Sequence, residues 1–140
     1  MIHKYSIDHV ALVARDAEAV AQHYKNMLSA TEITRDDIPE QGVFVILLQV
    51  GDSKLEIITP TVDDSGVARF LDKRGEGFHH VAYTVEDIEL ELARLESEGY
   101  RLIDSKPRKG IRGHLVAFIH PESTHGVLIE LVQHVDEVSN

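Results

Sequence analysis

Residues 78–99, FHHVAYTVEDIELELARLESEG, repeat the pattern of residues 7–28, IDHVALVARDAEAVAQHYKNML. Each stretch has His-Val-Ala within an apolar run typical of a strand, followed by an Asp ahead of a helix-like segment. His9 and His80 occupy matching places 71 residues apart, which is about half the chain. The sequence therefore contains an internal duplication at the scale of half a domain.

The remainder of each half continues the duplication. GVFVILLQV (42–50), a GDS turn and KLEIITP (54–60) predict one hairpin, and HLVAFIHP (114–121) with GVLIELVQ (126–133) predicts another. Each half is then one strand, one helix and two or three further strands. The two helices should each place apolar residues on one face, namely Val20, Tyr24, Met27 and Leu28 in the first and Ile88, Leu92 and Leu95 in the second.

The sequence favours one domain over residues 1–140. We expect a first module at about 5–61, a linking helix at about 65–74 with Ser65 as its N-cap, and a second module at about 77–134. The composition of the chain, with 43% hydrophobic and 27% charged residues, is ordinary for a globular protein. No apolar run approaches the roughly 18 residues of a membrane span, and the N-terminus lacks a signal-peptide pattern, so we expect a cytoplasmic protein without membrane contact.

Charge and cysteine content exclude several classes of function. The formal net charge of −10 argues against nucleic acid as a partner, because nucleic-acid binding needs a basic face. The chain has no cysteine, which excludes disulfides, thiolate zinc sites and a cysteine nucleophile. Any metal ion must therefore be held by His, Asp, Glu or Gln.

Four polar residues interrupt the apolar strands at corresponding places in the two halves: His9, Glu56, His80 and Glu130. Any one alone would more often be a hydrogen-bonded core histidine or a solvated glutamate. Their repetition favours a shared metal site, because a bound cation offsets the cost of burying carboxylates. Two imidazoles and two carboxylates suit Zn, Co, Ni, Mn or Fe.

The remaining histidines do not share this pattern. His79 adjoins His80, but successive strand residues point to opposite faces and its counterpart in the first half is Asp8, so we expect a structural role for His79. His134 looks like a surface residue. The first half of the sequence has no histidine at the place that corresponds to His114.

A basic stretch, KPRKGIRG, stands out in this acidic chain. It is either a solvated loop or an anion-recognition loop, and it carries Lys106, Arg108, Lys109 and Arg112.

The stretches IDHVALVARDAE, KLEIITP, SGVARFLDKRGEGFHHVAYTVEDI, KPRKGIRGHLVAFIHPEST and HGVLIELVQ resemble the vicinal oxygen chelate superfamily, and within it most of all the methylmalonyl-CoA epimerases. The resemblance covers nearly the whole chain. It implies an α+β fold of paired βαβββ modules, which form a cupped mixed sheet around a metal site. It also implies that His9, Glu56, His80 and Glu130 are the metal ligands.

The resemblance further implies an isomerase that interconverts (2R)- and (2S)-methylmalonyl-CoA by removing the α-proton through a metal-stabilised enolate. Glu56 and Glu130 are then the candidate catalytic bases, because a glutamate that some bacterial epimerases carry is replaced here by Val45. A divalent Co, Zn, Ni or Mn ion, an acyl-CoA substrate held by the basic stretch, and a homodimer are expected with it.

Two other functions remain open at this stage. A glyoxalase I-like lyase, or another metal-dependent isomerase of the superfamily, would use the same ligand set. A non-catalytic small-molecule binding module would generally lack a full set, whereas this chain retains all four residues.

Overall fold

The computed structural model describes residues 4–135. The chain divides into two compact units, a first unit of His9–His79 and a second unit made of the residues up to Asp8 and those from His80 onward. Strands β1 (Ser6–Val13) and β5 (Gly77–Thr84) each contain a point at which the chain passes from one unit to the other.

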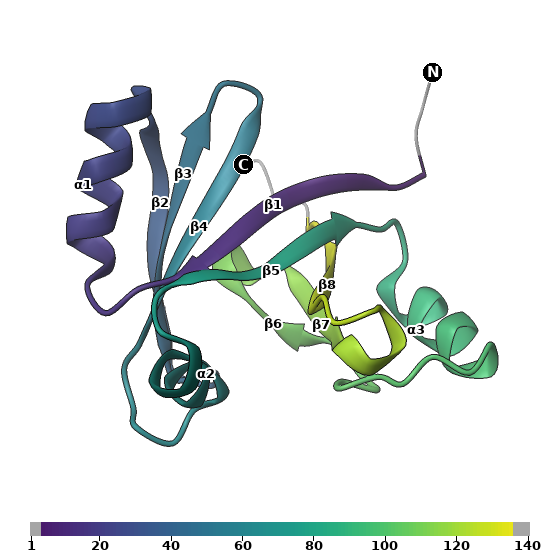
Figure 1. The fold of residues 1–140 in the computed structure, drawn as a ribbon. Helices are drawn as coiled ribbons and strands as arrows, with labels where there is room; N and C mark the ends of the chain where they lie inside the picture. The colour runs from purple at the N-terminus through teal and green to yellow at the C-terminus, as the bar shows by residue number, and fades with distance from the viewer. Residues whose placement is uncertain (1–3, 136–140) are drawn as a thin grey trace. The chain divides into compact units, whose positions relative to one another are not determined.

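The first unit is built on four strands in the order β2-β3-β4-β1. Neighbouring strands are antiparallel except for β4 and β1, which are parallel. In chain order, β1 is followed by α1 (Ala17–Leu28), β2 (Thr31–Ile38), β3 (Val43–Val50), β4 (Ser53–Pro60) and α2 (Gly66–Arg74). Figure 1 shows α1 alongside this set of strands, and its residues contact β3 and β4.

Helix α1 begins where the Asp16 side chain accepts a hydrogen bond from the Ala19 N–H group at 3.1 Å. Val20 and Tyr24 pack on the core of the first unit as predicted. The prediction was wrong for Met27 and Leu28, whose exposed fractions are 56% and 48%. Helical periodicity gives the direction of a side chain but not the extent of the core, so the last turn of α1 lies outside it.

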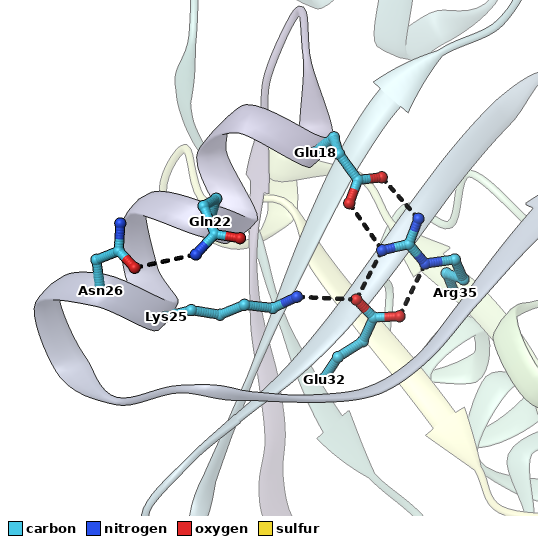
Figure 2. A network of polar contacts seen from close by, with 6 residues as sticks. All are labelled: Glu18, Gln22, Lys25, Asn26, Glu32 and Arg35. Carbon is cyan, nitrogen blue, oxygen red and sulfur yellow. Dashed lines mark hydrogen bonds and ion pairs between the residues drawn. The ribbon is translucent and has the colours of Figure 1, made fainter.

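A polar network joins α1 to β2 (Figure 2). Arg35 of β2 donates to both carboxylate oxygens of Glu18 in α1, at 2.6 and 2.9 Å, and to both of Glu32, at 2.8 and 2.7 Å. Lys25 of α1 donates to Glu32 at 3.2 Å. Because these residues come from both elements, their ion pairs hold the helix to the strand that follows it.

The expected linking helix is present as α2. The Ser65 hydroxyl accepts a hydrogen bond from the Ala68 N–H group at 3.0 Å, which confirms Ser65 as the N-cap. Ala68 and Leu71 are buried, and α2 packs against β4.

The second unit repeats this architecture with strand order β5-β8-β7-β6. β5 and β8 are parallel, and the other neighbours are antiparallel. The elements after β5 are α3 (Ile88–Ser97), β6 (Arg108–Lys109), β7 (Leu115–Ile119) and β8 (Ile129–Gln133). Ile88, Leu92 and Leu95 of α3 pack on the core of this unit, as predicted.

Each module therefore contributes one strand, one helix and three strands, and the predicted α+β fold of paired βαβββ modules is confirmed. The second hairpin has a longer connection than predicted, because β8 starts at Ile129 and a short 3₁₀ turn, Pro121–Ser123, precedes it. No helix within residues 4–135 is both long enough and apolar enough to cross a membrane.

Candidate metal centre

The first histidine–glutamate pair lies within the first unit. The parallel pairing of β1 with β4 sets Ala11 opposite Glu56, and Ala11 is two residues beyond His9 on the same face of β1. His9 Nε2 lies 3.6 Å from Glu56 Oε2, and both side chains are buried. The register of β1 against β4 thus brings together two residues that are distant in sequence.

The second pair lies within the second unit and repeats this register. Ala82 of β5 is opposite Glu130 of β8, and His80 is again two residues earlier. His80 Nε2 lies 3.1 Å from Glu130 Oε1. The edge of the His80 ring packs on Phe118, with ring centroids 5.1 Å apart, which fixes the orientation of the imidazole.

The chemistry of these residues fits a divalent metal ion. Glu56 and Glu130 are each only 6% exposed, although an isolated buried carboxylate is costly. Each carboxylate has an imidazole nitrogen of its own unit beside it, and nitrogen and oxygen donors are the usual ligands of Zn, Co, Ni and Mn. Each unit thus supplies one buried imidazole and one buried carboxylate that could bind a metal ion.

His79 occupies a different environment from its neighbour. Its ring packs edge-on against Phe70 of α2, with centroids 4.7 Å apart. This contact agrees with the structural role predicted for His79. Val45 is buried in β3 between Ile58 and Asp36 of the adjacent strands, and its side chain has no group that could transfer a proton.

The basic stretch is only partly a loop. Arg108 and Lys109 form β6, and Arg112 adopts a left-handed conformation in the short turn that follows. Consecutive strand residues point to opposite faces, so Arg108 and Lys109 do not present their charges side by side. Arg108 Nε also lies 3.3 Å from Asp104 Oδ1, so part of its charge is already neutralised. All four cations of the stretch are exposed.

Two polar clusters were not predicted from the sequence. Asp8 contacts Thr84 and His134, and His134 is exposed, as expected for a surface residue. Glu91 is buried in α3, where the Tyr5 hydroxyl donates to its two oxygens at 2.9 and 3.0 Å. The position of Glu91, three residues after Ile88 on the apolar face of α3, is the sequence signal that would have indicated its burial.

With the fold and the two pairs described, comparison with known proteins defines the class. Residues 8–118 match the family model of the glyoxalase/bleomycin resistance protein/dioxygenase superfamily. The chain belongs to this superfamily.

Within it, several of the similar proteins are epimerases. The chain is 39% identical to the ethylmalonyl-CoA/methylmalonyl-CoA epimerase of Cereibacter sphaeroides, over 91% of this chain and 96% of that protein. It is 35% identical to the human mitochondrial methylmalonyl-CoA epimerase, over 91% of this chain and 73% of that protein. A variant of the Streptomyces coelicolor methylmalonyl-CoA epimerase, solved in complex with 2-nitronate-propionyl-CoA, is 33% identical with a TM-score of 0.90, covering 93% of this chain and 97% of that one.

Proposed function

We propose that this protein is a metal-dependent epimerase that interconverts (2R)- and (2S)-methylmalonyl-CoA. The observation that carries the proposal is the repeated buried histidine–glutamate pair, His9 with Glu56 and His80 with Glu130. The names of several similar proteins support the substrate class, because these proteins are methylmalonyl-CoA epimerases, one of them also named for ethylmalonyl-CoA.

We propose that both pairs serve one divalent ion, Co, Zn, Ni or Mn. The identical register of the two pairs and the composition of the donor set support this assignment. When bound, the ion would supply Lewis-acid stabilisation of the negative charge that develops on the thioester oxygen.

Glu56 and Glu130 are the proposed bases. Epimerisation breaks the bond between the α-carbon and its proton, and a proton must then return to the opposite face of that carbon. One glutamate, as a carboxylate, accepts the first proton, and the other, starting as a protonated carboxylic acid, donates its proton to the opposite face, so each face of the α-carbon has its own glutamate. The two glutamates come from opposite halves of the duplication, and the buried Val45 cannot replace either of them.

The basic stretch is the proposed binding site for the CoA phosphates. Its cations, Lys106, Arg108, Lys109 and Arg112, are exposed in a protein of net charge −10. Local positive charge is what a polyanionic ligand needs on such a surface. In this proposal the Arg108 guanidinium contacts both the Asp104 carboxylate and a phosphate.

A glyoxalase I-like reaction is the second candidate, because the same ligand set would support it. Parallel assays on one Co²⁺-loaded preparation separate the two functions, one with methylmalonyl-CoA and one with methylglyoxal and glutathione. The proposal predicts turnover of the CoA thioester only. Turnover of the glutathione adduct alone would contradict it, and turnover of neither would favour the non-catalytic binding module. The single domain over 1–140, the homodimer and the cytoplasmic location remain predictions.

A further inference from the structure

The Asp8 carboxylate is held by two polar contacts. His134 Nε2 lies 2.6 Å from Asp8 Oδ1, and because a carboxylate only accepts hydrogen bonds, the imidazole is the donor. The Thr84 hydroxyl donates to the same oxygen at 3.3 Å. The Asp8 side chain is 10% exposed, whereas that of His134 is 37% exposed.

The imidazole that binds Asp8 is itself fixed in place. The His134 ring stacks on the buried His114 ring, with centroids 4.3 Å apart and an interplanar angle of 26°. His114 Nδ1 accepts a hydrogen bond from the Val135 N–H group at 3.0 Å, which ties down the backbone directly after His134. The partner of Asp8 is therefore an exposed histidine whose ring stacks on a buried one.

The partners of Asp8 stand at the ends of the two strands that carry the second proposed ligand pair. Thr84 is the last residue of β5, the strand of His80. His134 directly follows β8, the strand of Glu130. All these residues belong to the second unit, and the residue that follows Asp8 in the chain is His9, which begins the first unit.

We infer that Asp8 is a positioning residue for His9 through its contacts with Thr84 and His134. The inference rests on the proposed metal site. Fixing the Asp8 side chain to the ends of β5 and β8 limits where the next peptide unit can lie. It thereby restricts the backbone of His9, the residue bonded to Asp8. In this role Asp8 acts through the backbone of His9.

The test is Co²⁺ binding by the full chain, because it reports the ligand geometry without an activity assay. We expect Asp8→Ala and His134→Ala each to weaken the Co²⁺ dissociation constant about tenfold or more, the usual effect of losing a residue that orients a metal ligand. The visible absorption spectrum of bound Co²⁺ should also change, because it depends on the arrangement of the ligands. Asp8→Asn keeps an acceptor oxygen, so its Co²⁺ dissociation constant should be closer to that of the parent protein.

Two controls separate positioning from a general loss of stability. The Asp87 carboxylate is the N-cap of α3 and accepts a hydrogen bond from the Leu90 N–H group. Asp87→Ala should therefore cost about 1 kcal/mol of stability, and it leaves the Asp8 contacts unchanged. His23→Ala removes an exposed imidazole from α1. Both should bind Co²⁺ like the parent.

Three outcomes distinguish the inference from the proposal beneath it. If Asp8→Ala bound Co²⁺ with the same affinity and absorption spectrum as the parent protein, the positioning role would be overturned and the metal site would stand. An equal loss of Co²⁺ affinity in Asp8→Ala and Asp87→Ala would also overturn the positioning role, because both substitutions would then act by lowering the stability of the fold. Failure of the parent to bind Co²⁺, or retention of binding in His80→Ala, would instead contradict the metal site itself and the inference with it.

Discussion

Glu130 and Glu56 are buried carboxylates, and each faces an imidazole of its own unit. Their burial was predictable because a charged residue at the same place in two apolar strands is difficult to explain by chance. The contact of Asp8 with His134 was not predictable in this way. It depends on how the start of β1 meets the end of β8, and residues 126 positions apart carry no local signal of that contact.

Replacing one of these glutamates tests its role as a base. We expect Glu130→Gln to abolish solvent deuterium exchange at the α-carbon of methylmalonyl-CoA, and to lower kcat at least 100-fold, about the contribution of a general base. Glu91→Gln is the matched control, because it also alters a buried glutamate of the second unit but lies outside the proposed site. Full exchange in Glu130→Gln would remove Glu130 as a base.

At the scale of the elements, the network between α1 and β2 predicts a pH dependence of stability (Figure 2). The hydrogen bonds from Arg35, supplemented by Lys25, lower the pKa of Glu32 from 4.5 to about 2. A group with a lowered pKa stabilises the fold above its unfolded-state pKa, and this contribution is lost as the pH falls through the folded-state value. The Glu32 contribution should therefore be complete at neutral pH and decline between about pH 4.5 and pH 2.

Urea denaturation of Glu32→Gln measures this contribution. At neutral pH we expect a loss of about 0.5–1 kcal/mol in the free energy of unfolding, the range for partly exposed ion pairs. The difference from the parent should shrink as the pH is lowered towards 2, because the parent's carboxylate becomes protonated around its pKa of about 2. Glu96→Gln in the exposed part of α3 provides the control. A difference that stays constant over this pH range would contradict the assigned cause.

The basic stretch gives a second prediction at this scale. We expect the double variant Arg108→Ala with Lys109→Ala to raise KM for methylmalonyl-CoA about tenfold, a loss of about 1.4 kcal/mol in binding, and to change kcat much less. Arg101→Ala is the control, because it removes another exposed arginine of the same unit, the partner of Glu122, outside the stretch. An unchanged KM in the double variant would refute the assignment to CoA.

The elements themselves were predicted with uneven success. The hairpins and helices follow from hydrophobic period and turn residues, which are local properties of the sequence. The short strand β6 was not foreseen, since Arg108 and Lys109 carry no apolar pattern and are placed in a strand only by pairing with Val116 and Leu115 of β7. Exposure of Met27 and Leu28 was missed for a related reason, because their environment is set by tertiary structure.

At the scale of the whole molecule, the duplication was the most informative feature of the sequence. It predicted two equivalent modules, and the structure repeats even the strand register, with Ala11 opposite Glu56 and Ala82 opposite Glu130. Neither the metal nor the acyl group follows from that pattern, because the same ligands serve several reactions in the superfamily. The choice among those reactions must come from chemistry with a defined substrate.

Proton NMR with methylmalonyl-CoA in D₂O tests the central claim most directly. The protein is first freed of metal with a chelator and then divided, and one portion is loaded with Co²⁺. Our account predicts that the loaded protein replaces the α-proton with deuterium, so that its signal disappears and the methyl doublet collapses to a singlet. The metal-free portion should exchange no faster than a sample without protein. An α-proton that persists with the loaded protein, or equal exchange in both portions, would contradict a metal-dependent epimerase.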